Sequence, residues 1–342
     1  ERVLSIRDLE ISFDTVHGKA AAIRGMRFDL YRGETVAIVG ESGSGKSVTM
    51  KAVMGIISNN QHIDHGSIHY SWWDENGQKQ TADIAKMCPR DVRSKICGRH
   101  ISMVFQDPMT SLNPLYTIQR QMEEVLILHE PQMNAAQRKA RCLELLSAVG
   151  IPNPQERLKE YPNQFSGGMR QRVIIAIALA TNPRLLIADE PTTALDVTIQ
   201  EQILELMRKL VKEHNTALIL ITHDLAVVSQ MVDRINVMYC GKLVETGSTE
   251  DIVAFNAHPY TEGLLNSIPK LYEDRGRLDY IPGMVPNMFE LPEGCYFAPR
   301  CRYCQDICRH QQPVMREVGP GHLAACHFPL NKKAAAKTEE GK

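Results

Sequence analysis

The loop at residues 40–47 constrains this chain more than any other feature. Its sequence GESGSGKS fits the pattern G-x-x-x-x-G-K-[ST] and follows a strand-like apolar run at residues 35–39. In such a loop the glycines let backbone N–H groups surround a β-phosphate, the lysine reaches the β and γ oxygens, and the serine hydroxyl can ligate Mg²⁺. A helix that starts near Ser47 adds its positive N-terminal end. The sequence therefore predicts a nucleoside triphosphate site, and the preceding strand argues against a glycine turn that matches by chance.

Composition and charge exclude several classes of protein. The chain has 342 residues, long enough for two domains or for one large domain with an extension. Its formal net charge of −1 gives no signal for binding nucleic acid. The longest apolar run, at residues 173–180, is far shorter than the roughly 20 residues that cross a bilayer. The first residues show no basic stretch followed by an apolar core, so we expect a cytoplasmic protein. If it serves a membrane, other chains cross that membrane.

The hydrophobic pattern predicts an α/β core with a helical insertion. Alternation at residues 3–7 and 26–30 indicates antiparallel strands before the loop. Continuous apolar runs at 185–188 and 217–221 are typical of parallel strands covered on both faces. From about 117 to 180 the apolar residues follow helical spacing. Further elements are expected as a helix at about 47–55 and strands at 67–70, 101–105, 237–239 and 242–245, the last two forming a hairpin.

Three residues beyond the loop favour hydrolysis of the nucleotide. Asp189 and Glu190 close an apolar strand, as expected for a carboxylate that holds Mg²⁺ through water and one that polarises the attacking water. His223 ends the neighbouring strand and can hydrogen-bond both the γ-phosphate and that water. The acidic pair alone has an equally good structural explanation, and a lone histidine is more often structural. Their joint presence beside a phosphate loop favours the catalytic interpretation.

A second anion site is expected at Ser166-Gly167-Gly168. These residues open the helical run at 173–180, where a serine hydroxyl and backbone N–H groups can point at a phosphate. One chain thus carries two half-sites, and each half-site needs a complementary one from another chain. This predicts a head-to-tail pair of nucleotide domains with ATP at the seam.

Taken in order, these motifs resemble the ATPase subunit of ATP-binding-cassette (ABC) transporters. The resemblance implies an α/β fold of the ABC type, with a RecA-like parallel-sheet core, an antiparallel β-subdomain and an inserted helical subdomain. It implies that residues 40–47 are the Walker A motif, 166–168 the signature motif, Asp189 and Glu190 the Walker B pair, and residues 194–196 the D-loop. The signature departs from the usual L-S-G-G-Q at Phe165 and Met169, but the contacting serine and both glycines are kept.

The same resemblance implies a role for each site residue. Glu190, His223 and Gln106 are the implied catalytic residues, with His223 as the switch and Gln106 as a sensor of the γ-phosphate and of Mg²⁺. The residues implied to bind ATP are Gly40, Ser42, Gly43, Ser44, Gly45, Lys46, Ser47, Val48 and Asp189, with Phe13 or else His17 stacking on adenine. Ser47 and Gln106 are the implied Mg²⁺ ligands, and Ser166, Gly167, Gly168 and Arg170 would contact the ATP of the partner subunit. Asp196 is the implied D-loop residue.

Segments 105–114, 188–198 and 258–261 more closely resemble the ATPase subunits of oligopeptide and dipeptide importers, the OppD/DppD type. Prolines and glycines punctuate the sequence past residue 260, and the run at 294–327 resembles the extension of the same subfamily. We therefore expect an ABC ATPase domain at residues 1–262, with its helical subdomain at about 107–180, and a small, irregular, Cys-rich extension at 263–330. Residues 331–342 are expected to form a disordered, solvated tail.

The importer resemblance also implies partners. These are a paralogous ATPase subunit that forms a heterodimer, two transmembrane permease subunits, and an extracytoplasmic peptide-binding protein. Residues 107–116 would grip the cytoplasmic coupling helices of the permeases, which places the chain peripherally on the cytoplasmic face of the cell membrane. ATP would close the two ATPases, and hydrolysis would reset them.

The cysteines predict a metal site in the extension. Five of the nine cysteines fall within residues 295–326, and in a reducing cytosol such a cluster favours metal over disulfides. Cys295, Cys301, Cys308 and Cys326 suit an iron–sulfur cluster or a structural zinc site. The resemblance favours a [4Fe–4S] cluster on these four, with Cys304 as a spare thiol. Zinc, unmetallated thiols, and a shell in which Cys304 replaces Cys301 or Cys308 are the alternatives.

The sequence thus predicts an ATPase that powers import of oligopeptides or dipeptides. Within the same class, the cargo could instead be nickel, haem or a signalling peptide. A soluble ABC ATPase acting on ribosomes or DNA is disfavoured, because the chain has one Walker A motif and only 149 positions separate Gly40 from Asp189. An iron–sulfur redox sensor would leave the complete hydrolytic set unexplained.

Overall fold

The computed structural model describes residues 1–74, 76–193, 195–268 and 280–330. The chain divides into two compact units, one made of Glu1–Leu4, Leu30–Glu34 and Tyr70–Ile221, the other of the remaining residues. The predicted tail at 331–342 and part of the predicted extension, 269–279, lie outside the described residues. Each unit contains β-strands that contribute to its buried core.

The first unit contains a parallel sheet. Strand β7 (Leu185–Asp189) pairs in parallel with β6 (Ile101–Val104) on one side and with β8 (Ala217–Thr222) on the other. Every residue of β6 and β7 is buried. Strands covered on both faces leave no position for a solvated side chain, which is why their sequences are continuously apolar. The predicted parallel strands at 185–188 and 217–221 are confirmed.

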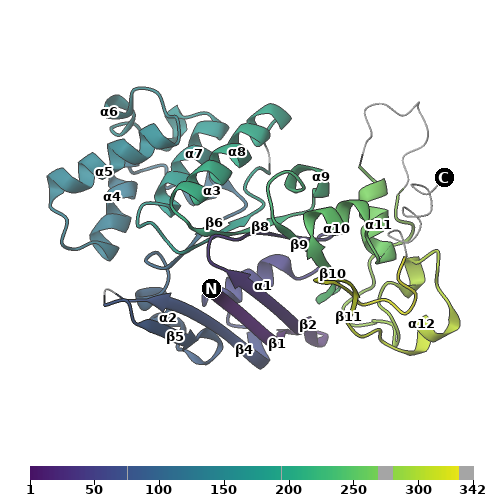
Figure 1. The fold of residues 1–342 in the computed structure, drawn as a ribbon. Coiled ribbons are helices and arrows are strands. Elements are labelled where there is room, and N and C mark those ends of the chain that lie inside the picture. Colours follow the sequence, from purple (N-terminus) through teal and green to yellow (C-terminus); the bar gives the residue numbers. More distant parts are fainter. Residues whose placement is uncertain (75, 194, 269–279, 331–342) are drawn as a thin grey trace. The chain divides into compact units, whose positions relative to one another are not determined.

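Helices make up most of the rest of the first unit, and Figure 1 shows them gathered together in teal and green. They are α3 (Pro108–Ser111), α4 (Ile118–His129), α5 (Ala135–Ala148), α6 (Pro154–Arg157), α7 (Gly167–Ala178) and α8 (Val197–Glu213). The helical spacing seen in the sequence corresponds to the buried face of α4, where Ile118, Met122 and Leu126 are inaccessible. Side chains of Thr117 and Asn134 cap the N-termini of α4 and α5.

Some elements of the first unit have no signal in the sequence pattern. They are β5 (Lys79–Asp83), α2 (Pro89–Lys95) and the 3₁₀ turns at Ile84–Lys86 and Pro162–Gln164. Strand β5 buries none of its residues fully, so it carries no apolar alternation. These short elements are stabilised by their neighbours rather than by their own composition.

The second unit contains most of β1 (Arg2–Thr15), β2 (Gly18–Tyr31) and β4 (Gln61–Trp73), which lie side by side in the order β2, β1, β4. The predicted alternation appears in β2, where Met26, Phe28 and Leu30 are buried and their neighbours are not. Strand β4 begins six residues before the predicted start at residue 67. Gly66 interrupts its pattern with a φ of +95°, because a side chain there would meet the carbonyls of Arg7 and Asp8 at 2.5 Å.

A second group of strands in this unit supports the phosphate loop. Strand β3 (Thr35–Val39) pairs in parallel with β9 (Arg234–Tyr239), and β9 pairs antiparallel with β10 (Lys242–Ser248). The predicted hairpin is confirmed, and its turn is Cys240-Gly241, whose φ angles of 46° and 78° fit a tight primed turn. Strand β12 (His322–Ala324) pairs with β10, and β11 (Arg316–Gly319) pairs with β12.

The remaining described elements of the second unit are helices. They are α1 (Lys46–Val53), α9 (Leu225–Val228), α10 (Thr249–Ala254), α11 (Pro259–Asn266), the 3₁₀ turn Ala298–Arg300 and α12 (Asp306–His310). Helix α1 matches the helix predicted after the loop. The C-terminal region is mostly irregular, as predicted, but its strand β12 extends the sheet of the hairpin.

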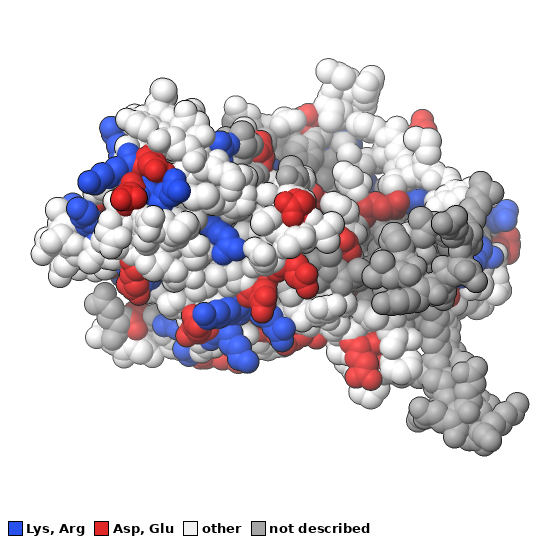
Figure 2. Space-filling view, turned by 90° about the horizontal axis from the view of Figure 1, so that it is seen from above, with Lys and Arg blue, Asp and Glu red and all other residues white. Residues whose placement is uncertain are grey.

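The mixture of charges on the surface agrees with the net charge of −1. Figure 2 shows Lys and Arg interspersed with Asp and Glu on the face that it draws. Among the described residues, the structure contains no helix with both the length and the apolar character of a membrane span.

A buried carboxylate joins the C-terminal strands to the hairpin. Glu245 of β10 is inaccessible to solvent, and its carboxylate accepts hydrogen bonds from the backbone N–H groups of Ala257 and His258. Its Oε1 also lies 2.7 Å from Nε2 of His322 in β12. A carboxylate can be buried at low cost only when several donors satisfy it, and here three do.

We expect Glu245→Ala to lower the free energy of unfolding by about 3–5 kcal/mol, since it leaves three buried donors without their acceptor. Urea denaturation followed by circular dichroism measures the change. Glu250→Ala is the control, because Glu250 is exposed in the first turn of α10. Equal losses in the two variants would contradict the assigned role of Glu245.

Candidate active site

The phosphate loop lies between the buried strand β3 and helix α1. Gly40, Gly43 and Gly45 have φ angles of 153°, 80° and 99°, which residues other than glycine rarely adopt. A Cβ atom at Gly40 would lie 2.2 Å from the carbonyl oxygen of Met238, and one at Gly45 would lie 2.4 Å from Ile23 Cδ1. Two of the glycines are therefore required by close packing as well as by backbone conformation.

Lys46 is almost fully buried, with 5% of its surface exposed. Its ammonium group donates hydrogen bonds to the carbonyl oxygens of Gly40 and Glu41, at 2.7 and 2.9 Å, and contacts Ser44 Oγ at 3.3 Å. The loop therefore curls around the lysine head group. A phosphate entering the loop would exchange these carbonyl contacts for phosphate oxygens, which are stronger partners for an ammonium ion.

Two predicted catalytic residues meet in the first unit. Glu190 follows β7 with a φ of +46°, and its backbone N–H donates to the carbonyl of Ile221 at 2.9 Å. Gln106 follows β6, and its Nε2 donates to Glu190 Oε2 at 2.8 Å. The parallel pairing of β6 and β7 brings their carboxyl ends to the same edge of the sheet. The structure thus brings Gln106 and Glu190 together, a contact that the sequence analysis did not predict.

Sequence reasoning did not single out Thr193, whose hydroxyl also donates to Glu190 Oε2, at 3.1 Å. Its position three residues after the glutamate is a spacing at which a hydroxyl can bond back to the preceding turn. The Glu190 carboxylate is therefore oriented by an amide and a hydroxyl. The left-handed backbone at Glu190 is a strained conformation of the kind that is found at functional sites.

The other residues predicted to bind or hydrolyse the nucleotide are distributed over both units. Asp189 ends β7 and is only 3% exposed, in the first unit with Gln106 and Glu190. His223 follows β8 as an exposed residue of the second unit, which also contains the loop at 40–47. Ser47 and Val48 lie half-buried in α1. Contacts between the loop and the carboxylates join residues of different units and stay predictions.

The signature residues form a helix N-terminus, as predicted. Ser166 is the N-cap of α7, and its Oγ accepts a hydrogen bond from the Met169 N–H at 3.3 Å. A side chain at Gly168 would meet Ile199 Cγ2 at 2.8 Å, so the glycine permits close packing against α8. Arg170 donates from Nε to the carbonyl of Pro162 at 2.7 Å. Its predicted contact with a partner's ATP stays a prediction.

The D-loop prediction falls partly outside the described residues, because Ala194 is not among them. Asp196 is described, and its side chain caps α8 by accepting from the Ile199 N–H at 3.0 Å. This gives Asp196 a structural role in starting the helix. The cap also holds the carboxylate at the helix N-terminus, where it is stabilised by the helix dipole.

The adenine-stacking residue is predicted near the turn between β1 and β2. Phe13 is half-buried in β1, whereas His17 is exposed in the turn. The ring of His17 lies 6.2 Å from the ring of Phe289, edge to face. Sequence reasoning gave no role to Phe289, which comes from the C-terminal region. The choice between Phe13 and His17 stays a prediction.

Four cysteines line one small pocket in the second unit. They are the predicted set Cys295, Cys301, Cys308 and Cys326, and Cys304 is not among the lining residues. The rest of the wall is largely aromatic or apolar, with His258, Pro259, Phe297, Ala298, Tyr303, His327 and Phe328. The structure thus brings the four predicted thiols together.

Burial determines the chemistry of these thiols. Burial raises the pKa of Cys301 to about 12 and that of Cys326 to about 11, and it also raises the pKa of Cys295. A metal that bound here would therefore have to displace protons from the sulfurs. Within the described chain, no group of three or more His, Cys, Asp or Glu residues has the geometry of a metal-ion site.

The sequence analysis also did not predict an ion pair within the second unit. Arg300 and Glu41 form a bidentate pair, with distances of 2.7 and 3.0 Å. The two residues are 259 positions apart, and neither lies in a periodic pattern. No local signal could have indicated their contact.

Comparison with known proteins gives two family matches along the chain. Residues 23–193 match the family described as "ABC transporter". Residues 244–308 match the family described as "Oligopeptide/dipeptide transporter, C-terminal region". The first match contains the loop, the signature residues and the Asp189–Glu190 pair.

Several curated proteins are similar over nearly their whole length. The dipeptide transport ATP-binding protein DppD of Bacillus subtilis is 47% identical over 327 residues, which is 95% of this chain and 94% of the relative. DppD of Escherichia coli is 44% identical, covering 96% of this chain and 97% of the relative. The oligopeptide transport ATP-binding protein OppD of Bacillus subtilis is 49% identical, covering 94% of this chain and 87% of the relative.

Solved structures agree with the fold. A dimeric ATP-binding cassette in a post-hydrolysis state, bound to ADP and phosphate, superposes with a TM-score of 0.61 at 27% identity, covering 72% of this chain and 98% of that one. CbiO1 from Clostridium perfringens, part of an ABC transporter complex, gives a TM-score of 0.60 at 25% identity, covering 75% of this chain and 92% of that one. The predicted ABC-type cassette fold is thereby confirmed.

Packing at Gly40 gives a test of the loop. We expect Gly40→Ala to weaken ATP binding roughly 10- to 100-fold, because the new methyl group must push the loop away from the Met238 carbonyl. Fluorescence titration with an ATP analogue measures the affinity. Gly77→Ala is the control, since Gly77 also has a positive φ but has nothing within 4 Å of the new atom. Unchanged ATP affinity in Gly40→Ala would contradict the proposed packing constraint.

Proposed function

Because this chain belongs to the ATP-binding subunits of ABC transporters, in the dipeptide and oligopeptide transport family, we propose that it hydrolyses ATP to power peptide import. The observation that carries the proposal is the contact of Gln106 with Glu190. A carboxylate at the end of a buried strand, oriented by an amide and a hydroxyl, is suited to act on a water molecule.

The residues of the site then divide the tasks of hydrolysis among them. The loop N–H groups and Lys46 bind the phosphates, and Glu190 accepts a proton from the attacking water. Gln106 orients Glu190, and His223 hydrogen-bonds the γ-phosphate. Mg²⁺, when bound, neutralises charge on the β- and γ-phosphates, and Ser47, Gln106 and Asp189 are the residues that would hold it.

ATP would lie between two such domains arranged head to tail. The capped N-terminus of α7 supports this arrangement, because Gly167 and Gly168 place backbone N–H groups at an end of the helix that favours anions. Ser166, Gly167, Gly168 and Arg170 would face the ATP of the partner, and Asp196 would lie at the seam. A paralogous ATPase subunit is the proposed partner, forming a heterodimer.

The first unit offers a surface for the membrane partners. Exposed apolar side chains gather there, with Leu115 79%, Ile127 52% and Leu128 68% exposed. Tyr116, Ile127 and Leu128 border one hollow beside α4. We assign this hollow, together with residues 107–116, to the cytoplasmic coupling helices of two permeases, which would place the chain peripherally on the cytoplasmic face. An extracytoplasmic binding protein would deliver the peptide.

We also propose the division into an ATPase domain at 1–262, with the helical subdomain at about 107–180, and an extension at 263–330. The second family match, at residues 244–308, supports a distinct C-terminal module. Uptake of nickel, haem or a signalling peptide by the same ATPase would use the same residues, because this subunit does not contact the cargo.

A [4Fe–4S] cluster is the group that we propose for the four cysteines. They line one pocket with a mostly apolar wall, which suits a cluster shielded from water, and Cys304 lies outside that lining as expected for a spare thiol. Cys295, Cys301, Cys308 and Cys326 would hold the cluster as thiolates. Its role would be structural, because the surrounding segment has little regular structure.

The catalytic assignment is tested in the transporter purified from its native membrane through a tag on this chain. Two permeases and a second ATPase should copurify. Glu190→Gln should bind ATP but lower hydrolysis at least 100-fold, because the amide cannot accept the proton of water. Glu205→Gln, exposed in α8, is the control. Recovery of ribosomes instead of permeases, or normal hydrolysis in Glu190→Gln, would contradict the proposal.

The cysteine assignment predicts about four iron and four acid-labile sulfide per chain after anaerobic purification. Cys326→Ser should lose most of this iron, because it removes a lining thiol. Cys304→Ser is the matched control and should retain it. Zinc without sulfide, or equal iron in the two variants, would overturn the cluster and leave the transport proposal intact.

A further inference from the structure

Arg300 is a buried cation whose hydrogen-bonding groups all point into the protein. Only 4% of its side chain is exposed. Nη1 and Nη2 donate to the two carboxylate oxygens of Glu41 at 2.7 and 3.0 Å. Nε donates to the Pro282 carbonyl at 3.0 Å, and Nη1 also reaches the Tyr239 hydroxyl at 3.3 Å. Such a fork-to-carboxylate pair fixes direction as well as distance.

Its partner Glu41 is the second residue of the phosphate loop, and three of its groups are held. The carboxylate is held by Arg300. The backbone N–H donates to the Tyr260 hydroxyl at 2.8 Å, and the carbonyl accepts from Lys46 at 2.9 Å. A phosphate that drew Lys46 away would release this carbonyl. Residue 41 is then held by Arg300 and Tyr260, both of which lie outside the loop.

The segment that carries Arg300 borders the four-cysteine pocket, because its residues Phe297, Ala298 and Cys301 line that pocket. Arg300 ends a 3₁₀ turn, Ala298–Arg300, and the next residue is Cys301. Phe297 lines the cysteine pocket and packs on the rings of Tyr239 and Tyr260 at 5.4 Å each. One short segment, residues 297–301, thus contacts the cysteine pocket on one side and the groups that hold Glu41 on the other.

We propose that Arg300 is a positioning residue for ATP binding, which couples the cysteine-rich region to the phosphate loop through Glu41. This inference rests on the proposed ATPase function. The guanidinium of Arg300 is engaged by Glu41, Pro282 and Tyr239, so it would act through Glu41, setting the backbone at residue 41 so that the N–H groups that follow face the nucleotide. The coupling is reciprocal, because a free-energy linkage between two sites acts in both directions.

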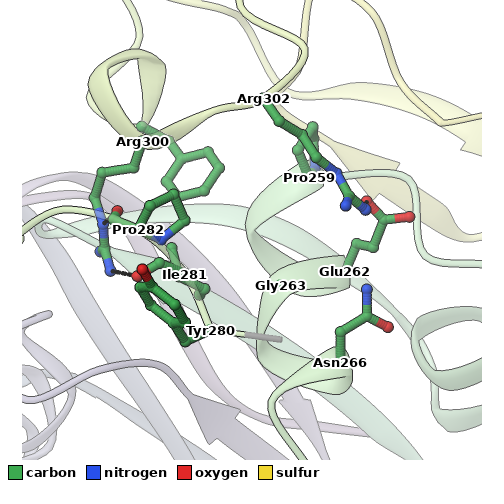
Figure 3. A pocket seen from close by; sticks show the side chains of 10 residues that line it. Pro259, Glu262, Gly263, Asn266, Tyr280, Ile281, Pro282, Arg300 and Arg302 are labelled. Carbon is green, nitrogen blue, oxygen red and sulfur yellow. Dashed lines mark hydrogen bonds and ion pairs between the residues drawn. The ribbon is translucent and has the colours of Figure 1, made fainter. Parts of the chain in front are cut away.

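Arg302 provides a matched control two residues away. Its guanidinium also pairs with a carboxylate, Glu262 of α11, at 2.6 Å. Figure 3 shows Arg302 directed at Glu262, whereas Arg300 is directed at Ile281 and Pro282. Arg302 is more than half exposed, and its guanidinium donates to Glu262 rather than to Glu41. Replacing it removes a similar charge without touching Glu41.

The test measures ATP hydrolysis by the purified full transporter. We expect Arg300→Met and Glu41→Gln each to raise the KM for ATP roughly 10-fold, a usual size for coupling between sites, with kcat changed less than about twofold. The double variant should show about the same shift as either single variant, because both remove one interaction. Arg302→Met should keep the wild-type KM. Equal KM values in Arg300→Met, Glu41→Gln and wild type would overturn the proposal.

A second readout separates positioning from loss of structure. In the wild type, ATP should slow hydrogen exchange of the backbone amides at 295–301, and in Glu41→Gln this protection should be lost while the unfolding midpoint stays within a few degrees. Glu41→Gln keeps the shape of the side chain, so it carries the test if Arg300→Met fails to fold. Protection that is equal in wild type and Glu41→Gln would also overturn the inference.

Failure of the inference is distinguishable from failure of the proposed function. If the wild-type transporter hydrolyses ATP and the variants match it, the function stands and the positioning role falls. If the wild type does not hydrolyse ATP, the function falls, and the affinity of the full chain for ATP then tests Arg300 by the same comparison of variants.

Discussion

Close backbone packing around the phosphate loop is the constraint on which the rest of the second unit depends. Gly40 lies against the carbonyl of Met238 in β9, and Gly241 of the hairpin turn donates its N–H to the Ser44 carbonyl at 3.0 Å. A side chain at Gly241 would meet the Ala22 carbonyl at 2.2 Å. Loop, hairpin and β2 are therefore in direct backbone contact. This contact explains why the hairpin closes through two residues with positive φ, a turn that brings the strands tightly together.

The predictable parts of the fold are those where burial dictates the sequence. Strand β7 could be predicted because every residue is buried, and α4 because one face is buried at helical spacing. Strand β5 could not, since it buries none of its residues fully and has no alternation. Strand β12 could not, because three residues carry too little pattern and its pairing with β10 is made across a long stretch of chain.

The residues of the active site also differ in how far the sequence predicts them. Gln106 and Glu190 are each predicted from their motifs, and they meet because each follows a strand and neighbouring parallel strands end at one edge. Thr193 could be found only from a local spacing rule, and Arg300 could not be found at all, because a pair 259 residues apart depends on the completed fold. Motifs reveal residues that touch the substrate. Residues such as Arg300, which act from a distant part of the chain, depend on tertiary packing and carry no sequence pattern of their own.

The chemistry of the Arg300–Glu41 pair also explains why an ion pair, rather than apolar packing, joins the C-terminal region to the loop. A buried ion pair adds little net stability compared with apolar side chains of similar size, but breaking one partner is costly, and the geometry of the pair is specific. Apolar contacts would hold the loop in place without determining the orientation of residue 41. A phosphate site needs its N–H groups aimed within a narrow range of angles, because misaligned hydrogen bonds weaken steeply. The planar fork of Arg300, itself held by Pro282 and Tyr239, transfers the rigidity of the aromatic cluster to a loop whose glycines would otherwise leave it free to adopt other conformations.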